Sequence, residues 1–152
     1  MTERAIIGVG NDLRHDDGFG PEVVAYLRGD PTLSDWCRLA VTDGEPTRLI
    51  DLWQGVEVAV VVDAVRAPGA PGGRRYEIVV DDLTRLPDGA VSSHAVSLGE
   101  TFELARVLDL LPQRLVVLGV TGVHFGSGLG LSPAVAAEVV PVARRALELI
   151  GA

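Results

Sequence analysis

Three acidic side chains and one histidine stand where they could act on a metal ion or a peptide bond. Asp16 and Asp17 follow the first apolar run of the chain, and Asp63 follows a nearly uninterrupted run of seven apolar residues. His94 lies in a Ser-Ser-His loop before a predicted helix. A carboxylate beside so apolar a segment is costly to desolvate without a partner. Two carboxylates and one imidazole that converge would form a ligand set with open positions, which suits Ni, Zn, Co or Mn.

Each of these residues also has an ordinary structural interpretation. Either Asp16 or Asp17 can cap the helix predicted to begin near Phe19, because Asp accepts free N–H groups at a helix N-terminus. The second of these two aspartates would then point into the ligand-binding crevice expected at the ends of the strands. Asp63 can cap a turn at the end of its strand, and a histidine in a loop is more often an exposed surface group. We place His15 in solvent. Residue types and spacing leave these alternatives open.

The elements that must position these residues are short apolar strands that alternate with helices. Strands are predicted at residues 5–9, 38–42, 56–62, 76–80 and 115–120. Val and Ile runs without polar alternation are typical of strands covered on both faces, and alternation with helices predicts a mostly parallel sheet. We therefore expect a single three-layer α/β/α domain over residues 1–152, with about five strands. Residues 66–75 are expected to form a flexible turn to an edge strand.

The predicted helices each carry one inward-facing stripe. Ser97 and Glu100 form a capping-box pattern that opens one helix, and its buried stripe is expected to reach Leu108. Ser132 is the expected N-cap of the last helix, which continues to Leu149.

Ligands of such sheets bind at the carboxyl ends of the strands, near the point where the strand order reverses. Polar residues and turns follow the predicted strands at this edge. They are Asn11, Asp16, Asp17, Asp43, Gly44, Asp63, Thr121 and His124. These positions are where the sequence predicts a reactive site.

Composition excludes several other classes of protein. The net charge is −8, all 13 basic residues are Arg, and no basic cluster could bind nucleic acid. No apolar run reaches the roughly 18–20 residues of a membrane helix, and no signal peptide is expected before the first strand. The single cysteine, Cys37, is expected to be a buried thiol in a reducing cytoplasm. Leu13 occupies a position where a dinucleotide-binding loop requires glycine.

Four segments resemble the nickel–iron hydrogenase maturation endopeptidases. They are GVGNDLRHDDGFGPEVVAYL at 8–27, VVDAV at 61–65, SSHAVSL at 92–98 and GLGLSPAV at 128–135. The likeness covers essentially the whole chain, in order and with matching spacing. Two positions depart from the family: Asp43-Gly44 replaces the usual Gly-Gly pair, and Thr121-Gly122 replaces an acid or amide followed by proline.

The resemblance implies a five-stranded α/β/α fold and an endopeptidase. Its substrate would be the hydrogenase large-subunit precursor, which loses a C-terminal extension after nickel insertion. The resemblance implies that Asp17, Asp63 and His94 are the catalytic and metal-contacting residues. The nickel would be carried by the substrate, so no tightly bound cofactor is expected. The other residues at this edge are then expected to bind substrate: Asn11, Asp16, Asp43, Gly44, Thr121 and His124.

Two alternatives remain. A non-catalytic metal-sensing or chaperone protein would bind the same partner without cutting it. A phospho-receiver domain also has carboxylates after its first and third strands, but it needs a lysine after the last strand, and this chain has no lysine.

Overall fold

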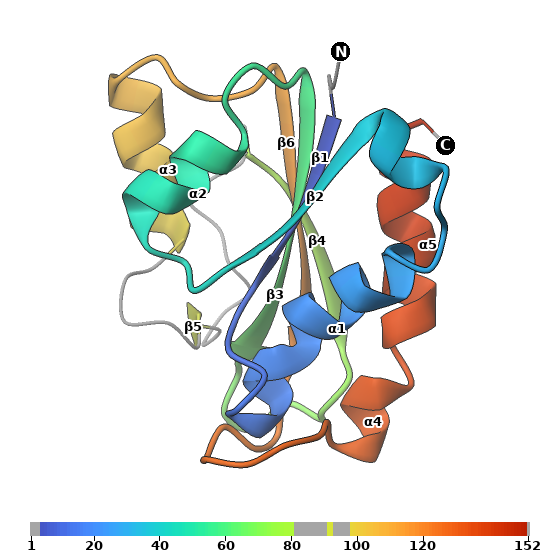
Figure 1. Cartoon of the computed structure of the whole chain (residues 1–152). Coiled ribbons are helices and arrows are strands. Elements are labelled where there is room, and N and C mark those ends of the chain that lie inside the picture. Colours follow the sequence, from blue (N-terminus) through green and yellow to red (C-terminus); the bar gives the residue numbers. More distant parts are fainter. Residues whose placement is uncertain (1–3, 81–90, 93–97, 152) are drawn as a thin grey trace.

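The computed structural model describes residues 4–80, 91–92 and 98–151. It contains a central sheet with helices on both sides (Figure 1). The strands are β1 (Arg4–Val9), β2 (Cys37–Thr42), β3 (Val58–Arg66), β4 (Arg75–Val79), β5 (Val91–Ser92) and β6 (Arg114–Thr121). The α-helices are α1 (Phe19–Leu27), α2 (Pro46–Leu52), α3 (Leu98–Val107), α4 (Pro133–Ala136) and α5 (Val139–Leu149). Two short 3-10 helices, η1 (His15–Gly18) and η2 (Leu33–Asp35), flank α1.

The sheet has the strand order β2-β1-β3-β6-β4. The first four strands are parallel, and β4 is an antiparallel edge strand on β6. The two-residue β5 pairs antiparallel with the end of β3, where Ser92 lies opposite Val65. The predicted mostly parallel sheet of about five strands is confirmed, as is the predicted edge strand.

The helices cover both faces of the sheet. Figure 1 shows α2 and α3 on one side and α1, α4 and α5 on the other. Successive residues of a strand point to opposite faces, so Val60 and Val62 of β3 pack with the α1 and α5 side chains. Ala59 and Val61 pack with the side chains of α2 and α3. In the described ranges, no helix combines the length and apolar character needed to span a bilayer.

The helix α3 is shorter than its apolar pattern predicts. It ends at Val107, because Asp109 adopts a left-handed conformation with a φ of 57°. Leu108 therefore leaves the helix and is 53% exposed, so its expected place in the buried stripe is wrong. Ser97 of the expected capping box lies outside the described residues.

The last predicted helix is divided in two. The first part, α4, ends at Ala136, and α5 begins at Val139. Pro141 supplies the physical reason, because proline has no N–H for the carbonyl of Ala137 and its ring clashes with that carbonyl. A continuous helix through this point would be strained, so our expectation of one uninterrupted helix is wrong.

The start of α1 lies directly against the carboxyl ends of β1 and β3. At Gly20, a Cβ atom would lie 2.6 Å from the carbonyl oxygen of Val62 and 2.7 Å from the backbone nitrogen of Val9. Only glycine lets the helix backbone approach the strands so closely. The approach brings η1, which contains Asp16 and Asp17, against β3. The fold thereby places these acids at the edge where the strands end.

The thiol of Cys37 is buried at the start of β2, with 1% of the residue exposed. Burial raises the pKa of Cys37 to about 11, so the thiol is protonated at neutral pH. The expectation of a buried thiol is confirmed.

Candidate active site

Asp63 lies inside β3 and not, as expected, just after it. The strand continues to Arg66, and Asp63 pairs in register with Gly119 of β6. Strand alternation puts its side chain in the row of Ala59 and Val61, on the α2 and α3 face. Asp63 is 0% exposed. A buried carboxylate lowers stability unless it is compensated, so this position favours a functional role.

Asp17 lies in η1, at the turn that leaves β1, and is 1% exposed. Its Oδ2 atom accepts a hydrogen bond of 2.9 Å from the N–H group of Asn11. The N-cap residue of α1 is Gly18 and that of η1 is Arg14, so neither Asp16 nor Asp17 occupies the N-cap position that the capping interpretation gave them. Because η1 packs against β3, Asp17 and Asp63 belong to the same edge of the sheet. Asn11 itself is exposed there, and its contact with substrate stays a prediction.

His94 lies outside the described residues. The described chain comes within two positions of it, because β5 ends at Ser92. Ser92 pairs with Val65, which is two positions after Asp63. Among the residues that the structure describes, no group of three or more His, Cys, Asp or Glu side chains is arranged to hold a metal ion. The role of His94 therefore stays a prediction.

Asp16 holds a loop that is distant in the sequence. Its side chain is 0% exposed, and its Oδ1 accepts the N–H group of Ser132 at 2.7 Å. Its Oδ2 accepts the N–H groups of Val123 at 2.7 Å and His124 at 2.9 Å. The Ser132 hydroxyl donates to the same oxygen at 2.8 Å and does not cap α4. The Asp16 carboxylate therefore organises residues 122–132, and its predicted contact with substrate stays a prediction.

These hydrogen bonds decide the charge state of Asp16. Burial raises the pKa of Asp16, but the hydrogen bonds from Ser132, Val123 and His124 outweigh it and hold the pKa below its ordinary value. The ionised form thus stabilises the folded chain. This contribution is fully present above the unfolded pKa of about 4 and is lost as the pH falls through the lower folded pKa.

Changing Asp16 to Asn is expected to lower the free energy of unfolding by about 2 kcal/mol at pH 7. One oxygen and an NH₂ group cannot accept the same N–H donors. Urea unfolding at 25 °C measures the change, and the exposed neighbour Asp12 supplies the control Asp12→Asn. The difference between wild type and Asp16→Asn should shrink as the pH falls below about 4, the pKa of the unfolded side chain. Equal stability at pH 7 would contradict the assigned role.

Thr121 holds the loop that follows β3. It is 1% exposed at the end of β6, and its hydroxyl donates to the carbonyl of Pro71 at 2.5 Å. The same hydroxyl accepts the N–H group of Arg74 at 2.9 Å, and the Thr121 carbonyl accepts the N–H group of Gly73 at 2.8 Å. Thr121 therefore fastens the loop after β3, and its contact with substrate stays a prediction. That loop, expected to be flexible, is held by these bonds.

His124 is exposed at the rim, so a contact with substrate remains a prediction. Its ring centroid lies 4.3 Å from that of His15. Nδ1 of His15 donates to the carbonyl of Gly130 at 3.1 Å. His15 is partly buried against this loop, so our placement of it in solvent is wrong.

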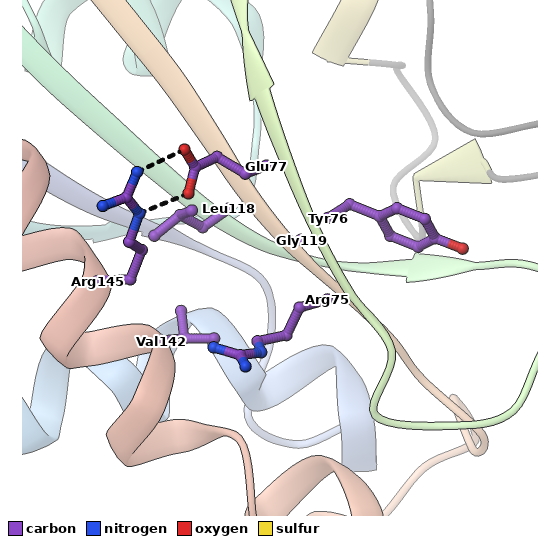
Figure 2. A pocket seen from close by; sticks show the side chains of 7 residues that line it. All are labelled: Arg75, Tyr76, Glu77, Leu118, Gly119, Val142 and Arg145. Carbon is purple, nitrogen blue, oxygen red and sulfur yellow. Dashed lines mark hydrogen bonds and ion pairs between the residues drawn. The ribbon is translucent and has the colours of Figure 1, made fainter.

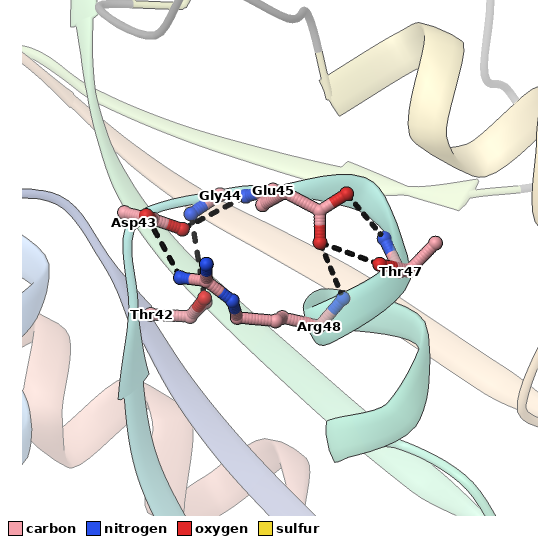
Figure 3. Close-up of polar contacts among 6 residues, drawn as sticks. All are labelled: Thr42, Asp43, Gly44, Glu45, Thr47 and Arg48. Atoms are coloured by element: carbon pink, nitrogen blue, oxygen red, sulfur yellow. Dashed lines mark hydrogen bonds and ion pairs between the residues drawn. The ribbon is translucent and has the colours of Figure 1, made fainter.

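Asp43 and Gly44 form the turn that leads from β2 into α2 (Figure 3). Asp43 accepts the N–H group of Glu45 at 3.1 Å and pairs with Arg48 at 2.9 Å. The Glu45 N–H bond, followed by the charge of Arg48, holds the pKa of Asp43 below its ordinary value. Glu45 caps α2 by accepting the N–H groups of Thr47 and Arg48, a role that sequence reasoning missed. Substrate binding by Asp43 and Gly44 stays a prediction.

One cavity of about 480 Å³ lies away from this edge, between β4, β6 and α5. Figure 2 shows the guanidinium of Arg145 facing the carboxylate of Glu77, with Tyr76 on the other side of the strand. The two Arg145–Glu77 hydrogen bonds, of 2.7 and 2.8 Å, hold the pKa of Glu77 below its ordinary value. The charges of Arg145 and Glu77 thus compensate each other in the wall of this cavity.

Comparisons with known proteins identify the family to which the chain belongs. The family model described as hydrogenase maturation protease matches residues 22–149. The hydrogenase expression/formation protein HupD of Thiocapsa roseopersicina is 30% identical over 97% of this chain and 67% of its own. The hydrogenase 2 maturation protease of Escherichia coli is 22% identical over 93% and 87%.

Solved structures are similar over almost the whole chain. The [NiFe] hydrogenase maturation protease HybD from Thermococcus kodakarensis has a TM-score of 0.78 at 24% identity, and covers 98% of this chain and 99% of its own. The hydrogenase 2 maturation peptidase from a Thaumarchaeota archaeon has a TM-score of 0.69 at 28% identity, over 99% of both chains. The similarity to the HybD structure shows that the two chains share a fold. The hydrogenase maturation protease model matches residues 22–149, which are most of this chain. The chain therefore belongs to the hydrogenase maturation protease family.

Proposed function

We propose that this endopeptidase removes the C-terminal extension of a nickel–iron hydrogenase large-subunit precursor after nickel insertion. The observation that carries the proposal is the pair of buried carboxylates, Asp17 and Asp63, at the carboxyl edge of the parallel sheet. The nickel arrives as part of the substrate. The reaction is placed in the cytoplasm, where a reduced thiol such as Cys37 is stable.

His94 completes the proposed centre. Ser92 lies beside Val65, two positions from Asp63. Two residues of extended chain span up to about 7 Å, which is enough for an imidazole at position 94 to reach the Asp63 carboxylate region. Two carboxylates and one imidazole leave coordination positions open on nickel, and thiolates of the precursor would fill them.

Two routes to hydrolysis fit these residues. The substrate's nickel can polarise the scissile carbonyl, or Asp17 or Asp63 can accept a proton from the attacking water. In both, the water oxygen bonds to the carbonyl carbon, the C–N bond breaks, and the proton reaches the leaving amine. Asp17 is positioned by Asn11, and Asp63 by the strand itself.

The test uses purified chain with nickel-loaded and nickel-free precursor, followed by intact-mass spectrometry. The nickel-loaded precursor is expected to lose the mass of its extension, and the nickel-free precursor to keep it. Binding without any loss of mass would contradict the proposal and favour a chaperone or metal-sensing role. Equal cleavage of both forms would contradict the role of nickel.

A further inference from the structure

A cavity of about 390 Å³ lies at the carboxyl edge of the sheet, beyond Asp63. One wall is the loop that starts at Arg66, and the other is formed by Gly122, Val123 and Phe125 after β6. We call it the Arg66 pocket. Arg66 is the last residue of β3, so the pocket begins three positions after Asp63. Sequence reasoning missed this pocket, although a charged residue at the end of an apolar strand was the available signal.

The guanidinium of Arg66 lies over an aromatic ring. Its Cζ atom is 4.7 Å from the ring centroid of Phe125, which restricts the side chain and stabilises it weakly. Arg48, Arg106 and Arg145 each pair with a carboxylate. Within the described part of the chain, Arg66 pairs with no carboxylate, and no acidic residue lines the pocket. The pocket therefore presents a positive charge to its contents.

The walls of the Arg66 pocket are held in place. A Cβ atom on Gly122 would collide with the Phe125 ring, so the ring lies directly on the backbone. A Cβ on Gly72 would likewise collide with Val123, which brings the two walls into contact. Thr121 fastens the loop wall through Pro71. A site with fixed walls binds its ligand without the entropic cost of ordering a loop.

The Arg66 pocket begins on the same strand that carries Asp63. An ideal Cβ on Gly122 lies 3.1 Å from Cβ of Asp16, the neighbour of Asp17. Asp63 and Arg66 are separated by about 10 Å of strand, which three residues of extended peptide also span. Because these two residues lie on opposite faces, a peptide that joins them crosses the edge of the sheet.

We propose that the Arg66 pocket is a specificity subsite that binds an acidic side chain of the precursor, about three residues from the scissile bond. This inference rests on the proposed function. An extended segment of the precursor that enters the reaction centre would place such a side chain beside the Arg66 guanidinium. Small residues of the loop after β3 would contact the backbone of that segment. Arg66 is thus a specificity-determining residue and takes no part in the proton transfers.

The test measures kcat/KM for nickel-loaded precursor with Arg66→Gln, Arg66→Lys and the control Arg74→Gln. Arg74 is on the same loop, but its guanidinium lies over Tyr76, outside the pocket. Each Asp or Glu near the cleavage point of the precursor is also changed to its amide. Calorimetry measures binding of a peptide that spans the cleavage point.

Arg66→Gln is expected to lower kcat/KM and peptide affinity about tenfold, with a smaller loss for Arg66→Lys and none for Arg74→Gln. One acid-to-amide change in the precursor should lower the kcat/KM of the wild-type enzyme about tenfold as well. The same change should cause no further fall in the kcat/KM of Arg66→Gln. Equal peptide affinity of wild type and Arg66→Gln would overturn the proposed subsite. It would also be overturned if every acid-to-amide change in the precursor lowered the kcat/KM of Arg66→Gln as much as that of wild type. A wild type that binds the peptide but cuts no precursor contradicts the proposed function alone.

Discussion

Changing Asp63 to Asn is expected to slow removal of the precursor's extension by about 10³-fold. Asn has nearly the size of Asp, so the packing of the buried strand is preserved. The substitution removes the negative charge that would ligate nickel and accept a proton. The rate is followed by intact-mass spectrometry of nickel-loaded precursor with excess enzyme.

The matched control for this variant is Asp51→Asn, because Asp51 is an exposed acid on α2. It should process precursor at the wild-type rate. Urea unfolding of both variants separates a loss of chemistry from a loss of folded protein. Processing by folded Asp63→Asn at the wild-type rate would show that the reaction centre lies elsewhere.

Changing Gly20 to Ala is expected to lower the free energy of unfolding by about 3 kcal/mol. The added Cβ would lie 2.6 Å from the carbonyl oxygen of Val62 and 2.7 Å from two backbone atoms of Val9. Both residues are in central strands that cannot yield without disturbing their neighbours. Alanine favours a helix over glycine by about 1 kcal/mol, which is too little to offset the collision.

Processing should also slow in Gly20→Ala, by more than about tenfold, because displacing α1 moves η1 and Asp17 away from β3. Gly119→Ala is the control, since a Cβ on this buried glycine would meet no atom nearer than 3.7 Å. Its free energy of unfolding should change by less than about 1 kcal/mol. If Gly20→Ala were as stable as wild type, the close approach of helix and strands would not matter.

The secondary structure was largely predictable because its signals are local. Uninterrupted Val and Ile runs predict buried parallel strands, and β1, β3 and β6 are such strands. The errors fall where a local pattern meets a backbone constraint. Leu108 continues the apolar stripe of α3, but the left-handed Asp109 ends that helix. Pro141 divides the last helix although the apolar pattern continues through it.

The two adjacent acids show why the site was only partly predictable. Both suit a helix N-terminus by residue type, yet the side chain of Asp16 is bound by Val123, His124 and Ser132, more than 100 positions away. No local pattern contains those donors. Thr121 likewise donates to the carbonyl of Pro71, which is 50 positions away in the sequence.

By itself, the sequence determined the layered α/β architecture, the family and the edge of the sheet at which the acids gather. These depend on periodicity and on motifs that are contiguous in the chain. Only the tertiary structure decided that Asp16 is a loop anchor, that Asp63 lies within its strand and that Arg66 faces a cavity. The reason is that hydrogen-bond partners and cavity walls come from loops that are distant in sequence and meet only after the sheet has formed.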